Sequence, residues 1–161
     1  MLCLTDGRSA TQRAHESSRN DLVVIDLALD YASATRIGLS RADQCSEAGY
    51  RAIVGVLQTA GFAVSPLKDV PGMAVMRTVV MLANEGAEAV DQAVCTGTDV
   101  DSAMRKGVNY PCGPLAWADS IGLVAVQQVL DNLARHYGED RYRTSSLIRR
   151  CVYAGKGLHA Y

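Results

Sequence analysis

The sequence has 161 residues, a formal net charge of −1 at pH 7, 48% hydrophobic residues and 20% charged residues. This length provides one sizeable core or two small subdomains, and the near-neutral charge gives no electrostatic reason to expect nucleic acid or an acidic membrane surface as a partner. Aromatic residues make up only 6% of the chain, which disfavours a base-stacking surface.

The first 69 residues alternate strand and helix signals. The strongest strand signal is Leu22–Leu29 (LVVIDLAL), because a continuous, β-branched apolar run is typical of a strand buried on both faces. Gln44–Ala60 predicts an amphipathic helix that ends before Gly61. Its predicted apolar face consists of Ile53, Leu57 and Ala60, with Val56 beside them. Weaker signals predict strands at 2–5, 36–40 and 62–65 and a helix at 9–17. The alternation indicates a small α/β region over residues 1–69.

After Pro71-Gly72 the pattern is helical. Residues 73–95 contain no proline, and their polar side chains fall on one narrow stripe. We therefore expect a central helix that is covered on most sides. The stripe is formed by Arg77, Asn84, Glu88 and Asp91, and the apolar faces include Val75, Val79, Leu82, Val90 and Val94.

Three further helices follow. Thr98 is the expected N-cap of the first, with Asp101 as its N3 partner, and Gly107 is its expected end. Apolar residues then recur at helical spacing over 123–137, up to Gly138, and a last helix is expected at 146–154 before Gly155. Residues 70–161 therefore predict a bundle of four to five helices.

The stretch GVNYPCGPLAWAD, residues 107–119, combines turn residues with large apolar side chains. Pro114 fits the first turn of a helix, where its missing N–H is not needed. Tyr110, Leu115 and Trp117 then have two helices to pack between. Two interpretations stay open at this point: a buried corner between helices, which we favour, and a ligand-lining surface.

Cysteine and histidine spacing indicates neither a metal site nor a disulfide framework. The five cysteines form no Cys-x-x-Cys pair and the three histidines are isolated. No secretory leader pattern opens the chain, and no apolar run reaches the ~18 residues of a membrane span. We expect a soluble, cytoplasmic protein. The cysteines are Cys3, Cys45, Cys95, Cys112 and Cys151, and the histidines are His15, His136 and His159.

The run TDVDSAMRKGVNYPCGPLAWADSIGL resembles the C-terminal domain of the 3-hydroxyacyl-CoA dehydrogenase family. That family has an acidic Ile/Val-Asp-x-Ala-Met start, then Gly-x-x-Pro-x-Gly-Pro and Asp-x-x-Gly-Leu, and all three stand here, with one residue more between Gly107 and Pro114 than some relatives have. Upstream, DVPGMAVMR resembles its Asp-x-Pro-Gly-Phe-x-x-Asn-Arg, and downstream SSLIRRCVYAGKGLHAY resembles its closing segment. The resemblance covers about residues 69–161. It implies a helical bundle of the 6-phosphogluconate dehydrogenase C-terminal-like type, so the expected fold is mixed α and β and mostly helical.

The segments GVNYPCGPLAWAD and HYGEDRYR are most similar to the last third of the bacterial long form of the family (the 3-hydroxyadipyl-CoA type), which is linked to phenylacetate degradation. The resemblance implies that residues 1–69 are a remnant of a degenerate second dehydrogenase copy. It also implies fatty acid metabolism, with NAD and an acyl-CoA bound in a parent enzyme that has an N-terminal dinucleotide-binding domain.

The departures from the family pattern predict a chain without catalytic residues. The family's His-Phe-x-x-Pro segment is missing, no Gly-x-Gly-x-x-Gly opens a helix, and Met76 stands where the family has an asparagine. We expect no catalytic, cofactor-binding or metal-binding residue in this chain. The residues expected to form the structural motif, and possibly a cleft wall, are Gly107, Tyr110, Pro111, Gly113, Pro114, Trp117 and Asp119.

Two functional hypotheses remain. In the first, the chain is the C-terminal part of an NAD-dependent 3-hydroxyacyl-CoA dehydrogenase, which oxidises 3-hydroxyacyl-CoA to 3-oxoacyl-CoA, and it supplies dimerisation and a wall of the substrate cleft. In the second, it is a free-standing, non-catalytic scaffold or binding module derived from that enzyme. Separately, we expect a homodimer held chiefly by helices between Pro71 and Tyr137, and the rival outcome is a monomer whose small α/β region covers the same apolar positions.

Overall fold

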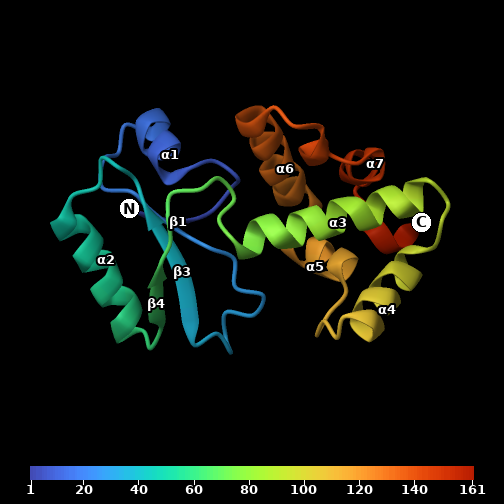
Figure 1. Ribbon diagram of the computed structural model, residues 1–161, viewed down its shortest axis with the longest axis horizontal. Coiled ribbons are helices and arrows are strands. Elements are labelled where there is room, and N and C mark those ends of the chain that lie inside the picture. The colour runs from blue at the N-terminus through green and yellow to red at the C-terminus, as the bar shows by residue number, and fades with distance from the viewer. The chain divides into compact units, whose positions relative to one another are not determined.

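The chain divides into two units, Met1–Arg77 and Thr78–Tyr161, in the computed structural model, which describes all 161 residues (Figure 1). It forms four β-strands, seven α-helices and two short 3-10 helices. The strands and the first two helices belong to the first unit, and all helices from α4 onward belong to the second. The predicted fold, mixed and mostly helical with a small α/β region before a helical bundle, is confirmed. The boundary predicted between residues 69 and 70 lies before the division between Arg77 and Thr78.

A four-stranded mixed sheet forms the centre of the first unit. Its strands β1 (Leu2–Leu4), β2 (Val23–Ile25), β3 (Arg36–Arg41) and β4 (Ala63–Pro66) lie in the order β1-β2-β3-β4. The pairs β1–β2 and β3–β4 are parallel, while β2–β3 is antiparallel. Each parallel pair needs a crossover, and α1 (Ala10–Ser17) and α2 (Glu47–Thr59) supply them.

Strand β2 is shorter than predicted. Leu22, Val23 and Val24 are fully buried, as expected for a strand covered on both faces, but regular pairing ends at Ile25 instead of Leu29. The strand ends because the next residue, Asp26, directs its side chain to another part of the unit. Its carboxylate accepts the backbone N–H of Ala74, Val75 and Met76 at 2.8–3.0 Å.

The buried face of α2 also differs from the predicted one. Leu57 is buried and Ile53 is half-buried, but Val56 is 66% exposed and Ala60 is exposed. The core is instead completed by Tyr50 and Val54, and the i, i+3, i+4, i+7 spacing from 50 to 57 places these four side chains on one helical stripe.

Helix α3 (Val75–Asp91) is the long helix predicted after Pro71. Val79, Val80, Ala83 and Ala87 are buried, and Leu82 and Val90 are partly buried, so the prediction of a largely covered helix is confirmed. Two predictions at its ends are wrong. Val75 is 37% exposed, and Val94, which follows the helix, is 71% exposed.

Asn84 was expected on the polar stripe of α3, and the structure shows it buried. Its amide nitrogen donates to the carbonyl of Arg143 at 2.9 Å, and its amide oxygen accepts the N–H of Ser145 at 2.8 Å. Both polar ends of the side chain are therefore paired, as a buried amide requires. Asn84 connects α3 to the loop before the last α-helix.

The second unit gathers α4 (Gly97–Gly107), α5 (Pro114–Ile121), α6 (Leu123–Tyr137) and α7 (Ser146–Ala154) around α3 (Figure 1). Short 3-10 helices, η1 (Asp140–Tyr142) and η2 (Leu158–Ala160), flank α7. Helices α6 and α7 end at Gly138 and Gly155, whose φ angles of 64° and 63° suit glycine, and both predicted ends are confirmed. None of the helices is long and apolar enough to cross a membrane.

Candidate functional site: the α4–α5 corner

The start of α4 uses a different cap from the one predicted. The run CTGTDVD contains two overlapping Thr-x-x-Asp patterns, and the structure uses Thr96 with Asp99 instead of Thr98 with Asp101. The Thr96 hydroxyl accepts the N–H of Asp99, and the Asp99 carboxylate accepts the N–H of Thr96. The Thr96 hydroxyl also donates to the Asp99 carboxylate at 2.7 Å, and this bond, with that from the Thr96 N–H, holds the pKa of Asp99 below its usual range. The choice of the earlier pair leaves Asp101 available for a different role.

Asp101 caps α5 instead of α4. It is buried, and its two carboxylate oxygens accept the N–H groups of Leu115 and Ala116 at 2.9 and 3.0 Å. These are donors of the first turn of α5, which have no partner within that helix. A negative charge is also favourable at a helix N-terminus. One helix therefore supplies the cap of the next.

Gly113 and Pro114 make this cap possible. A Cβ atom built on Gly113 would lie 2.0 Å from Cγ of Asp101, so any larger residue here would collide with the capping carboxylate. The φ of Gly113 is −76°, an ordinary angle, so the glycine is required by space and not by backbone conformation. Pro114 occupies the first turn of α5, as predicted.

Asp119, at the other end of α5, binds the closing segment of the chain. Its carboxylate accepts the N–H of Leu158 at 3.1 and 3.2 Å from its two oxygens, and it contacts Nδ1 of His159 at 3.1 Å. The other ring nitrogen of His159, Nε2, lies 2.9 Å from Oδ2 of Asp101. The imidazole thus joins the two aspartates of the corner.

The remaining motif residues lie around this corner. Leu115 is fully buried, and the rings of Tyr110 and Trp117 pack at a centroid distance of 5.7 Å while both stay half-buried. Pro111 and Gly107 are exposed, and nothing lies within 4 Å of a Cβ built on Gly107. Of the predicted site residues, the structure therefore brings together Gly113, Pro114 and Asp119, with the aromatic pair beside them.

Sequence reasoning missed the roles of Asp101 and His159. Asp101 was assigned to the wrong cap, and His159 was treated as an isolated histidine. No sequence signal placed His159 beside the corner, and the close approach that positions it is seen only in the folded chain, where a Cβ on Gly157 would lie 3.0 Å from Oδ2 of Asp119. A glycine at such a close approach indicates a packed turn beside a polar partner.

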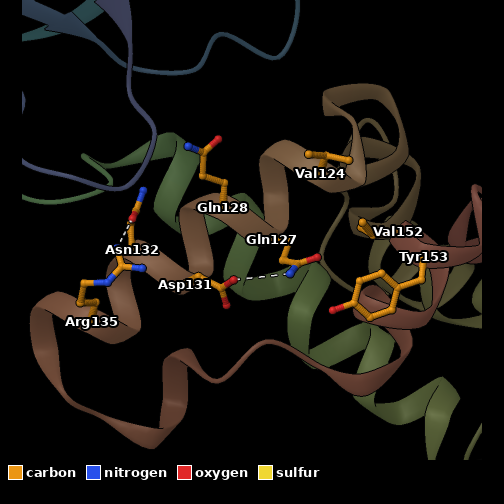
Figure 2. A pocket seen from close by; sticks show the side chains of 8 residues that line it. All are labelled: Val124, Gln127, Gln128, Asp131, Asn132, Arg135, Val152 and Tyr153. Carbon is orange, nitrogen blue, oxygen red and sulfur yellow. Dashed lines mark hydrogen bonds between the residues drawn. The ribbon is translucent and has the colours of Figure 1, made fainter.

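The structure also contains a shallow hollow between α6 and α7, of ≈ 410 Å³, which no sequence signal indicated (Figure 2). Some of its polar groups are paired, while Oε1 of Gln127 is buried without a hydrogen-bond partner. The Asp131 carboxylate accepts hydrogen bonds from Thr144 and Arg149, both at 2.8 Å. The Arg135 guanidinium donates to the side-chain oxygen of Asn132 at 2.7 Å. Such a surface holds two helices together and presents no activated nucleophile or base. Its lining residues are Val124, Gln127, Gln128, Asp131, Asn132, Arg135, Val152 and Tyr153.

The α4–α5 corner can hold helix ends but shows no reactive group of its own. Its two carboxylates are engaged by backbone N–H groups and by one imidazole. No cluster of three or more His, Cys, Asp or Glu side chains could hold a metal ion. At position 76, the buried Met76 offers a thioether, which donates no hydrogen bond.

Two sequence models match the chain, one in each part. The model of the 3-hydroxyacyl-CoA dehydrogenase C-terminal domain matches residues 72–158, more than half of the chain, and that of the 3-hydroxybutyryl-CoA dehydrogenase reduced Rossmann-fold domain matches residues 2–71. The fold and the matches agree, and the chain belongs to the 3-hydroxyacyl-CoA dehydrogenase family.

Individual relatives agree with this assignment. The chain is 37% identical over 160 residues to 3-hydroxyadipyl-CoA dehydrogenase of Escherichia coli, covering 99% of this chain and 33% of that protein. A crystal structure of 3-hydroxybutyryl-CoA dehydrogenase from Escherichia coli K12 superimposes with a TM-score of 0.89 at 37% identity, over 95% of this chain and 31% of that one. A second crystal structure, of (S)-3-hydroxybutyryl-CoA dehydrogenase from Ralstonia eutropha, superimposes with a TM-score of 0.80 at 25% identity, over 98% of this chain and 59% of that one. The chain thus spans about a third of the length of its Escherichia coli relatives.

Proposed function

We propose that this chain is the C-terminal part of an NAD-dependent 3-hydroxyacyl-CoA dehydrogenase, in which it supplies dimerisation and a wall of the substrate cleft while other parts of the enzyme carry the chemistry. The observation that carries this proposal is the use of the motif carboxylates. Asp101 and Asp119 bind backbone N–H groups of α5 and of residue 158 at 2.9–3.2 Å, so they build the domain instead of reacting.

The start of α1 supports the expectation that NAD is bound by another part of the enzyme. A helix that follows the first strand of a dinucleotide-binding fold receives the pyrophosphate at its N-terminus. Here the carboxylate of Asp69 accepts the N–H groups of Ala10 and Thr11 at 2.6 and 2.8 Å, and the Ser9 hydroxyl accepts that of Gln12. The chain's own groups use the donors that a phosphate would need.

By likeness to the Escherichia coli relative, we propose a parent enzyme with an N-terminal dinucleotide-binding domain, NAD as its cofactor, an acyl-CoA as its substrate and a role in phenylacetate degradation. The family assignment and the 37% identity support this extension. Residues 1–69 are then a reduced copy of the dinucleotide-binding fold, and residues 70–161 are the helical domain. Tyr110 and Trp117 are the proposed cleft-wall residues, because their paired rings remain half-exposed.

A chimera tests the proposal. The matching third of the Escherichia coli 3-hydroxyadipyl-CoA dehydrogenase is replaced by this chain, and NADH formation from a 3-hydroxyacyl-CoA is measured beside the unmodified enzyme and the isolated chain. We expect turnover by the chimera and the enzyme and none by the isolated chain. Turnover by the isolated chain, or a folded chimera without activity, would contradict the proposal. The second outcome would favour a free-standing scaffold.

Association of the isolated chain is a separate test. Exposed apolar side chains on α3 and α6, such as Val75 and Val124 (69% exposed), support a homodimer through the segment between Pro71 and Tyr137. A specific interface should bury at least ~1,000 Å² in total. Light scattering at micromolar concentration should give about twice the chain mass of 17.2 kDa. A mass of one chain that does not increase with concentration would refute the dimer.

A further inference from the structure

His159 contacts a carboxylate with each of its ring nitrogens. Nδ1 lies 3.1 Å from Oδ2 of Asp119 on α5, and Nε2 lies 2.9 Å from Oδ2 of Asp101 on α4. An ionised carboxylate only accepts hydrogen bonds, and a neutral imidazole carries a single N–H. Both contacts can therefore be hydrogen bonds only when the ring is doubly protonated. In either neutral tautomer, one nitrogen lone pair would face a carboxylate oxygen.

The two carboxylates that contact the His159 ring act in the same direction. Asp101 faces it from α4 and Asp119 from α5, and both favour the imidazolium. Two cations, Arg150 of α7 and Lys156 of the turn after it, lie over the ring of Tyr161, at 5.0 and 5.9 Å from its centroid, and a positive charge near His159 acts in the opposite direction. Cys151 of α7 donates to the carbonyl of residue 157, and burial raises the pKa of its thiol, so it remains neutral.

The imidazole closes a packed turn. Residues 157–160 run over the α4–α5 corner, with Leu158 fully buried and its N–H bound to Asp119. The backbone is close on both sides: a Cβ on Gly97 would lie 3.1 Å from the carbonyl oxygen of Leu158, and one on Gly157 would lie 3.0 Å from Asp119. The ring, with a side-chain exposure of 36%, still reaches solvent protons.

We propose that His159 is a pH-dependent latch, which in its protonated form fastens the turn of residues 157–160 to α4 and α5 and releases it on deprotonation. Partial burial disfavours the charged ring, but the hydrogen bonds to Asp119 and Asp101 outweigh it and raise the pKa of His159 above its ordinary value of 6.5. A group whose pKa is raised in the folded state stabilises that state fully when the pH is below its unfolded-state pKa. The latch is therefore closed below pH 6.5 and opens as the pH rises through the folded-state pKa of His159.

NMR of the 161-residue chain tests the latch with two readouts. The carbon-bound ring protons report the titration of each histidine, and the hydrogen-exchange protection of the Leu158 amide, corrected for the intrinsic rate, reports the closed turn. We expect the pKa of His159 to lie above its ordinary value of 6.5. Protection at Leu158 should fall by up to about fivefold across that titration, the upper range for a partly exposed ion pair.

The variant His159→Gln and the matched control His136→Gln complete the test. Glutamine keeps a donor but does not titrate, so protection at Leu158 should become independent of pH in H159Q and remain pH-dependent in H136Q. A merely structural turn would show no such dependence in the unmodified chain. The proposal is overturned if His159 titrates at or below pH 6.5, or if protection at Leu158 is flat across the titration. Neither measurement requires a variant to fold.

Discussion

The substitution Gly113→Ala should destabilise the second unit strongly, because its new methyl group would lie 2.0 Å from Cγ and 2.3 Å from Oδ1 of Asp101. Asp101 is buried and has no open space to enter, so the carboxylate must leave the N–H groups of Leu115 and Ala116. Loss of a helix cap costs about 1 kcal/mol, and overpacking or an unpaired buried group costs about 1–3 kcal/mol. We expect a loss of about 3 kcal/mol in the free energy of unfolding, a large part of a domain's stability.

Urea denaturation followed by the fluorescence of Trp117, the only tryptophan, measures this loss within the second unit. The matched control is Gly107→Ala in the same segment, where a Cβ meets nothing within 4 Å. It should be neutral or stabilise the unit by up to about 0.5–1 kcal/mol, because alanine favours a helix over glycine. The reasoning is refuted if the free energies of unfolding of the two variants differ by less than about 1 kcal/mol, the typical cost of one lost helix cap.

Three further outcomes are expected. Asn84→Ala should lower the melting temperature through a loss of about 1–3 kcal/mol, since it leaves buried backbone groups unpaired, whereas Gln92→Ala on the exposed end of the same segment should change it little. Asp26→Ala should cost about 2 kcal/mol and accelerate amide exchange at Met76, and unchanged exchange there would contradict the capping role. Calorimetric titration with NAD should show no micromolar binding, because Asp69 holds the N-terminus of α1.

The elements that the sequence predicts well are those fixed by local signals. Helices α6 and α7 end at glycines in the left-handed region, and Pro114 begins α5 in the first turn, where it is tolerated. Each of these signals lies within a few residues of the feature that it determines. The apolar spacing of residues 123–137 is also local, so the extent of α6 follows from it directly.

The features that were predicted wrongly or incompletely depend on partners far along the chain. Strand β2 ends early because Asp26 binds N–H groups 48 to 50 residues later, which no local pattern reveals. Asn84 reads only as a member of the polar stripe until its partners, 59 and 61 residues away, are known. The Thr-x-x-Asp patterns at Thr96 and Thr98 are locally equivalent, and α5 decides between them because it needs Asp101 as its cap.

The site was predictable in composition but not in arrangement. The stretch 107–119 was expected to form a helix corner, and Leu115 is indeed fully buried there. The carboxylates that hold the corner lie at its end and outside it, at Asp119 and Asp101, and the imidazole that joins them lies 40 and 58 residues away. Side-chain partners at these separations become visible only once the chain is folded.

The separation of Asp101 and His159 also has a kinetic consequence. The two residues of the capping box, Thr96 and Asp99, are three positions apart in the chain, whereas Asp101 and His159 are 58 positions apart. The larger loop-closure entropy of the second contact must be offset by other contacts first. We predict that this contact forms after the folding transition state. His159→Gln should therefore accelerate unfolding and leave the refolding rate nearly unchanged, so that the imidazole governs how long the second unit stays folded and not how quickly it forms.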